Sequence, residues 1–182
     1  MTDQFNYQIV RDPEIISLMN AFQFEEVTWN ESSLESDIRY SDPDKAKTLL
    51  TATHAIIATK YLSQHKVTFT YARPWAGKTS DGENCEYHND KLCEIDEFVN
   101  RPNRVVSNYI ALYYHSDLKM AGISGIEFWN KLTGAKQLIR PESGDLILVD
   151  ERDNNDHIWH RVVKYENPDL KRYVVGFGFV TE

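Results

Sequence analysis

In the stretch RYVVGFGFV, residues 172–180, two kinds of side chain alternate with a period of two. Arg172 and the small residues at every second position after it form one set, and the large apolar residues between them form the other. Such alternation is typical of a β-strand, because successive side chains point to opposite faces of a sheet. One face of this strand therefore leaves room for a ligand, whereas the other face needs an apolar cover.

The period of two begins at residue 66 and dominates the rest of the chain. Gly, Asn, Asp and Pro, which favour turns, separate the alternating segments. The residues that follow position 71 are expected to form a loop between strands. Short strands joined by turns favour an antiparallel sandwich or barrel. The predicted strands are 66–71, 104–114, 123–129, 136–140, 145–149, 158–165 and 172–180.

Two helices are predicted ahead of the strands. Asp12-Pro13 and Asp42-Pro43 each place an N-cap residue before a proline at the first helical position, where the missing N–H costs nothing. Behind the second pair, apolar residues recur at three- and four-residue spacing through about residue 64, which indicates a helix with one buried face. We therefore expect a single domain, in which residues 1–65 are mainly helical support and residues 66–182 form the β-rich core.

The composition excludes several classes of protein. The chain has 182 residues, 41% of them hydrophobic and 12% aromatic, which suits one folded domain with a sizeable core. Its net charge of −8 argues against nucleic acid and anionic lipid as partners. Cys85 and Cys93 have a spacing that fits neither a zinc pair nor a disulfide framework, so both are expected to be reduced. Without a membrane-length apolar run or a secretion signal, the expected location is the cytoplasm.

Histidines, an acid and an arginine follow one another in an order that suits a metal centre. Two imidazoles and one carboxylate can hold Fe(II) on one face and leave positions open for a co-substrate and dioxygen. Residues two apart on a strand share a face, so a His-x-Asp pair can reach one metal. An arginine can then grip a carboxylate of the co-substrate through two parallel hydrogen bonds. The chain contains His88-Asn89-Asp90, His115-Ser116-Asp117, His157, His160 and Arg172.

Over about residues 66–182, the sequence resembles the iron(II)- and 2-oxoglutarate-dependent oxygenases, and within them the prolyl 4-hydroxylase type. The resemblance implies a mainly β protein with N-terminal helices, folded as a double-stranded β-helix of the jelly-roll or cupin-like kind. The blocks that carry it follow in order: Tyr71, His88-Asn89-Asp90, 104–114 with Ala111-Leu112-Tyr113-Tyr114, 122–128, 144–148, His160-Arg161-Val162 and Arg172-Tyr173.

Carried over residue by residue, the resemblance implies specific roles. His88, Asp90 and His160 would be the iron ligands, and Arg172 would be the catalytic-site partner of the C5 carboxylate of 2-oxoglutarate. Tyr114 would hydrogen-bond the same carboxylate, and Tyr71 would line the co-substrate pocket.

Two alternatives remain open for the metal ligands. The second motif, His115-x-Asp117, could replace the first, although it would remove the block that supplies Tyr114. His157 could replace His160, although only His160 begins the His-x-Val pattern of the family.

The function that the resemblance implies is that of an Fe(II)- and 2-oxoglutarate-dependent dioxygenase that hydroxylates a C–H bond. The expected substrate is a prolyl residue of a peptide or protein, or a free amino acid. Fe(II), 2-oxoglutarate and O2 would take part, and ascorbate is a candidate reductant. The alternative is a non-catalytic jelly roll that binds a metal or a carbohydrate, because a fold does not determine a function. No oligomeric state is predicted.

Overall fold

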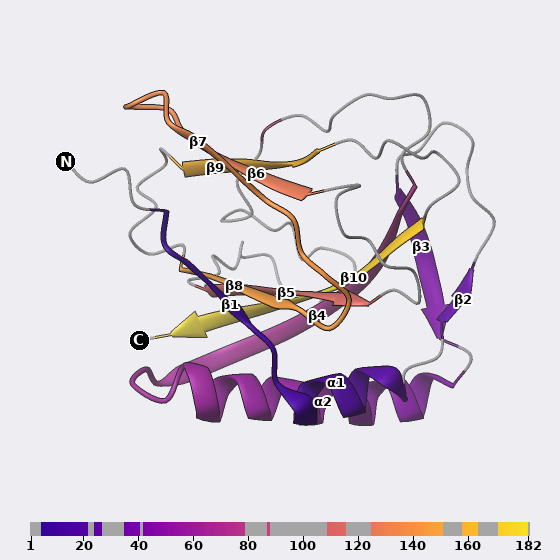
Figure 1. Cartoon of the computed structure of the whole chain (residues 1–182). Coiled ribbons are helices and arrows are strands. Elements are labelled where there is room, and N and C mark those ends of the chain that lie inside the picture. Colours follow the sequence, from indigo (N-terminus) through magenta and orange to yellow (C-terminus); the bar gives the residue numbers. More distant parts are fainter. Residues whose placement is uncertain are drawn as a thin grey trace, which may run out of the picture.

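The computed structural model describes residues 5–21, 24–26, 35–40, 42–78, 87, 109–115, 125–150, 158–163 and 171–181. Within these ranges the chain forms two helices and two antiparallel sheets (Figure 1). Neither helix of this part of the chain is long and apolar enough to cross a membrane.

The larger sheet has seven strands in the order β1-β8-β5-β10-β4-β3-β2. The smaller sheet has three strands in the order β7-β6-β9. The strand bounds are β1 (Tyr7–Val10), β2 (Phe24–Glu26), β3 (Glu35–Tyr40), β4 (Val67–Lys78), β5 (Tyr109–His115), β6 (Gly125–Asn130), β7 (Lys136–Ile139), β8 (Leu146–Asp150), β9 (Ile158–Val163) and β10 (Lys171–Thr181).

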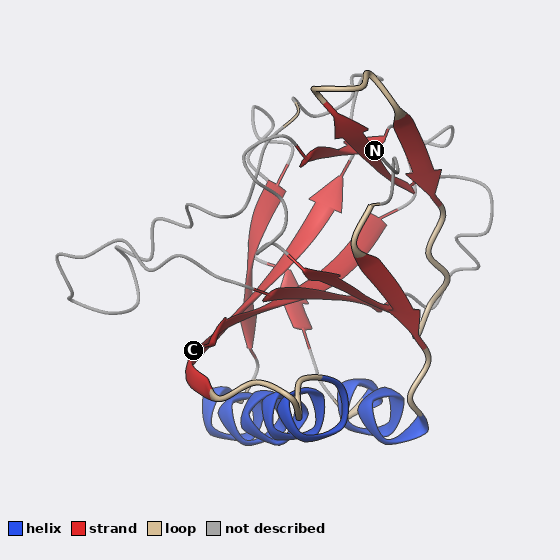
Figure 2. Ribbon diagram, turned by 90° about the vertical axis from the view of Figure 1, so that its left-hand side faces the viewer, coloured by secondary structure: helices blue, strands red, loops and turns tan. Residues whose placement is uncertain are grey.

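The two helices are α1 (Pro13–Asn20) and α2 (Pro43–Tyr61), and both begin where the Asp-Pro pairs predict. The Asp12 carboxylate accepts a hydrogen bond from the Glu14 N–H at 2.8 Å, and the Asp42 carboxylate accepts one from the Lys45 N–H at 3.0 Å. These bonds satisfy backbone donors that have no partner within a helix. Figure 2 shows both helices on the face of the seven-stranded sheet that lies away from the three-stranded sheet.

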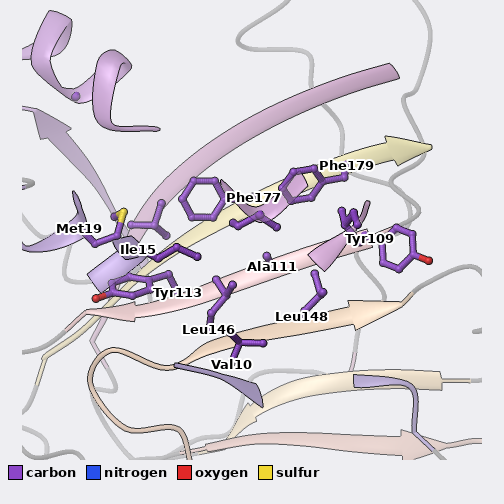
Figure 3. Close-up of a cluster of buried hydrophobic side chains, with 14 residues drawn as sticks. Val10, Ile15, Met19, Tyr109, Ala111, Tyr113, Leu146, Leu148, Phe177 and Phe179 are labelled. Atoms are coloured by element: carbon purple, nitrogen blue, oxygen red, sulfur yellow. The ribbon is translucent and has the colours of Figure 1, made fainter. Parts of the chain in front are cut away.

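Strand β10 contributes to two separate hydrophobic clusters, one on each face of the large sheet. Val175, Phe177 and Phe179 belong to the helix-side cluster, in which they pack with residues of α1 and α2 (Figure 3). Val174 belongs to the inter-sheet cluster, which is made of Phe5, Ile110, Leu112, Tyr114, Ile126, Phe128, Ile139, Ile147, Val149 and Val174. The structure thus confirms that the large apolar set of β10 is covered by the helices.

One expectation about the strands is wrong, and the N-terminal part of the chain contains strands that the sequence pattern did not predict. The segment after residue 71 is not a loop, because β4 continues to Lys78 and pairs with β10 along its whole length. Residues 1–65, expected to be mainly helical support, contain β1, β2 and β3 besides the two helices. Strand β1 pairs with β8, from Tyr7 opposite Val149 to Val10 opposite Leu146. Backbone pairing with distant partners defines these strands, and side-chain alternation does not reveal it.

Candidate functional site

The inner face of the three-stranded sheet carries His160, one of the predicted iron ligands. Strand β9 places His160 directly opposite Phe128 of β6, and opposite residues of an antiparallel pair share a face. Phe128 belongs to the inter-sheet cluster, and the two rings lie 5.9 Å apart between centroids. His160 is only 6% exposed. The imidazole of His160 is therefore buried on the wall that faces the seven-stranded sheet.

The facing wall of the seven-stranded sheet carries Tyr114. This tyrosine is 2% exposed, lies opposite Val174 and belongs to the inter-sheet cluster. Its main chain is held on both sides, because the Tyr114 N–H donates to the Asp145 carbonyl at 2.9 Å and the Gly144 N–H donates to the Tyr114 carbonyl at 2.8 Å. Tyr114 and His160 thus come from opposite sheets and border the same buried cluster.

Position 172 lies on the same face of β10 as Val174, because the two are two residues apart in a strand. Val174 lies opposite Tyr114, so position 172 is a diagonal neighbour of Tyr114. Diagonal neighbours lie roughly 7–8 Å apart, which long side chains can span. The backbone therefore brings positions 114 and 172 together.

Tyr71 lies farther along the same sheet. The register places Tyr71 opposite Gly178, whereas Arg172 lies opposite Gly77. Six positions along a strand correspond to roughly 20 Å at 3.3 Å per residue. The backbone register therefore does not bring Tyr71 to the neighbourhood of Arg172.

The alternative metal motif begins at His115, whose backbone position is set by strand β5. His115 ends β5 and lies opposite Tyr173 of β10. Position 115 shares a strand face with Tyr113, which packs in the helix-side cluster. Position 115 therefore lies on the face of β5 opposite to that of Tyr114.

His88 and Asp90, as well as His157 and Asp117, lie outside the described residues. Among the residues that the structure does describe, no group of three His, Cys, Asp or Glu side chains could hold a metal ion. The donor types of the set His88, Asp90 and His160 match those of an Fe(II) site with two histidines and one carboxylate. The buried imidazole of His160 on the inner wall fits that set.

The outer face of the three-stranded sheet holds a polar cluster that the sequence did not predict. We call it the outer cluster, and its members are Tyr87, Glu127, Trp129 and Arg161. The Tyr87 hydroxyl donates a hydrogen bond to Oε1 of Glu127. Arg161 approaches the same oxygen with Nε at 3.0 Å and Nη2 at 2.8 Å. The Tyr87 ring lies 5.0 Å from that of Trp129 and 4.5 Å from the guanidinium carbon of Arg161.

The protonation states within the outer cluster follow from these contacts. Burial opposes the ionised form of Glu127, but Tyr87 and Arg161 outweigh it and hold the pKa of the Glu127 carboxyl below its ordinary value. Burial, and then the hydrogen bond to Glu127, raise the pKa of the Tyr87 hydroxyl. Glu127 is thus an anion that accepts hydrogen bonds from a neutral phenol and a cation at neutral pH. No sequence signal combines these residues, because Glu127 and Arg161 are brought together by the β6–β9 register and Tyr87 joins them through its hydrogen bond to Glu127.

No family model and no curated protein matches the sequence. The fold, in contrast, is similar to solved structures. A prolyl hydroxylase from Trichoplax adhaerens, in complex with a peptide fragment of the oxygen degradation domain of hypoxia inducible factor, has a TM-score of 0.57 at 14% identity, over 97% of this chain and 84% of that one. A Pseudomonas putida prolyl-4-hydroxylase has a TM-score of 0.53 at 11% identity, over 98% and 94% of the two chains.

A third similar structure is that of HygX from Streptomyces hygroscopicus with nickel and 2-oxoglutarate bound. It has a TM-score of 0.53 at 12% identity, over 97% of this chain and 83% of that one. These likenesses confirm the predicted fold, a mainly β double-stranded β-helix with N-terminal helices, and at such low identity they concern the fold alone.

Proposed function

We propose that this protein is an Fe(II)- and 2-oxoglutarate-dependent dioxygenase that hydroxylates a C–H bond. The observation that carries the proposal is that His160 and Tyr114, from different sheets of a double-stranded β-helix, both border one buried cluster. In this proposal the residues that hold the metal and those that hold the co-substrate lie on opposite walls of the interior. The solved structures of similar fold support the same class, since they include prolyl hydroxylases and a protein with 2-oxoglutarate bound.

In this proposal His88, Asp90 and His160 hold the metal, which when bound supplies the oxidative chemistry by which 2-oxoglutarate and O2 are consumed. The chain itself provides the position of His160. Its strand is paired to β6 on one side, and its ring packs near Phe128. A ligand held in this way keeps its orientation whether or not the metal is bound, which lowers the cost of assembling the site.

Arg172 and Tyr114 would bind the C5 carboxylate of 2-oxoglutarate. Their positions are diagonal neighbours on β10 and β5, so an arginine fork and a phenol can reach one carboxylate. The buried apolar inter-sheet cluster includes Tyr114 and Val174, and a charge pair is stronger in apolar surroundings than in bulk solvent. Tyr71 is proposed only as a more distant wall residue of the same face.

For the substrate, we propose a prolyl residue of a peptide or protein, with a free amino acid as the second candidate. The Trichoplax adhaerens prolyl hydroxylase is in complex with a peptide, which supports a peptide substrate here. HygX has also been solved with hygromycin B bound, so proteins of similar fold differ in what they bind. A panel of proline-containing peptides and free amino acids, assayed for succinate release, would separate these classes.

The first test is an anaerobic titration of the protein with Fe(II) and 2-oxoglutarate. Chelation of the metal by the keto acid produces a weak visible charge-transfer band, which we expect for the wild type. The band should disappear in His88→Ala and His160→Ala and should survive in His115→Ala. Arg172→Leu should raise the concentration of 2-oxoglutarate that is needed for the band. Absence of the band in a folded wild-type protein would refute the oxygenase and favour a non-catalytic jelly roll that binds a metal or a carbohydrate.

A further inference from the structure

The outer cluster lies back to back with the proposed metal site on the same two strands. Glu127 and Arg161 are directly opposite each other, and so are their neighbours Phe128 and His160. Since adjacent residues of a strand face opposite ways, the first pair lies on the outer face and the second pair on the inner face. Every restraint on Arg161 therefore acts on the residue that follows His160 in the chain.

The outer cluster also reaches the other half of the proposed ligand set. Tyr87, whose hydroxyl donates to Glu127, immediately precedes His88 in the sequence. Consecutive Cα atoms are about 3.8 Å apart, so anchoring Tyr87 restricts where the next residue can be. One carboxylate oxygen of Glu127 thus binds one residue beside each of the two predicted histidine ligands.

The contacts of Glu127 are strong enough to act as a restraint. The Glu127 and Arg161 side chains are 18% and 23% exposed, so their ion pair is shielded from much of the solvent that weakens surface pairs. The carboxylate accepts charge-assisted hydrogen bonds, which are about twice as strong as neutral ones. The rings of Tyr87 and Trp129 pack against each other, and Lys136 Nζ lies 5.3 Å from the Tyr87 ring centroid.

We propose that Glu127, together with Tyr87 and Arg161, is a positioning residue that sets the spacing between the segment of His88 and the strand of His160. Glu127 touches neither the metal nor the substrate in this scheme. It holds the two ligand-bearing segments to a common point on the outer face. This inference rests on the proposed function, because it assumes that both histidines bind one metal.

The test measures metal affinity, which does not require turnover. Co(II) is the probe, because its visible spectrum reports the geometry of its ligands. The variants are Glu127→Ala, which removes the shared acceptor, and Tyr87→Phe, which removes one donor and retains the ring. We expect either change to raise the Kd for Co(II) about tenfold, the lower end of the range for residues that orient metal ligands. The Co(II) spectrum of each variant should also change.

The matched control is Tyr109→Phe. This variant also removes a tyrosine hydroxyl with a protein partner, since the Tyr109 oxygen lies 2.8 Å from Nε2 of His65 on the helix side of the large sheet. It should lower thermal stability and leave the Co(II) affinity unchanged. Glu127→Gln, which retains an acceptor oxygen but not the charge, should restore part of the affinity that Glu127→Ala loses.

Further outcomes separate this inference from the proposed function. If Tyr87→Phe raises the Kd in the wild type but not in a Glu127→Ala background, the two residues act together, as proposed. If His88→Ala and His160→Ala abolish Co(II) binding while folded Glu127→Ala and Tyr87→Phe bind as the wild type does, the positioning role is refuted and the proposed function stands. If the folded wild type binds no Co(II), both are refuted.

Discussion

Replacement of Asp12 tests how the helical layer is joined together. One oxygen of the Asp12 carboxylate caps α1, accepting from the N–H groups of Glu14 at 2.8 Å and Ile15 at 3.4 Å. The other oxygen accepts from the end of α2, from the Tyr61 hydroxyl at 2.7 Å and the Lys60 ammonium at 3.0 Å. The side chain is buried. A single carboxylate therefore connects the start of one helix to the end of the other.

The loss of stability in Asp12→Ala, measured as the free energy of unfolding, follows from these contacts. An N-cap contributes about 1 kcal/mol, and a hydrogen bond from Tyr61 to a charged acceptor contributes about 1.5–3 kcal/mol. The Lys60 side chain is 44% exposed, so water screens its share. Because neighbouring terms are not additive, we expect a loss of about 3 kcal/mol in the free energy of unfolding. For a chain of this size that lowers Tm by on the order of 10 °C.

Asp12→Asn separates the cap from the charge, because asparagine also caps helices well. Burial opposes ionisation of Asp12, but the hydrogen bonds from Tyr61, Lys60 and the α1 backbone outweigh it and lower its pKa from 3.8 to about 2. A lowered carboxyl pKa stabilises the fold above the unfolded-state pKa, and this contribution is lost as pH falls through the folded-state value. Because solvent screens the contribution of Lys60, we expect the negative charge of Asp12 to add about 1–2 kcal/mol to the free energy of unfolding at neutral pH.

The assay is urea unfolding, followed by tryptophan fluorescence, at pH 7 and at steps between pH 4 and pH 2. The difference between wild type and Asp12→Asn should be constant above about pH 5 and should shrink toward pH 2. Asp42→Ala, which removes the exposed cap of α2, is the control and should cost about 1 kcal/mol. A loss below about 1 kcal/mol in Asp12→Ala, or a wild-type advantage over Asp12→Asn that does not change with pH, would contradict the role assigned to the Asp12 carboxylate.

The remaining predictions concern the sheets and the co-substrate wall. Gly125→Ala would place a Cβ 2.3 Å from the Ile139 carbonyl oxygen, so we expect a loss of about 2–3 kcal/mol in thermal or urea unfolding. Gly134→Asn, at a φ of 76° with nothing within 4 Å of the new Cβ, should cost under about 1 kcal/mol, and equal losses at the two sites would contradict the packing argument. Tyr114→Phe should raise the Kd for 2-oxoglutarate about tenfold, the equivalent of roughly 1.4 kcal/mol for a hydrogen bond to a carboxylate. Tyr113→Phe, its neighbour on the helix side, should leave that Kd unchanged, and a similar rise in both variants would exclude a specific role for Tyr114.

Local features of this protein could be predicted from sequence because they depend on residues near one another in the chain. The Asp-Pro pairs cap and start both helices, and the chemistry of capping needs only three or four neighbouring residues. The alternation in β10 predicted which of its apolar residues face the helices, because the pleat of a strand has a period of two whatever its partners are.

The features that could not be predicted from sequence depend on strand pairing. Strand β4 extends to Lys78 because β10 pairs with it, and position 115 falls on the helix side because the register with β10 places it there. The outer cluster joins Tyr87 to Glu127 across 40 positions of the chain, and Glu127 to Arg161 across 34. Such contacts are absent from any local pattern, because a register shift by one residue would send every side chain of a strand to the opposite face. Helix starts and strand faces can thus be inferred from neighbouring residues, whereas strand length, strand partners and the contacts between distant segments depend on the register.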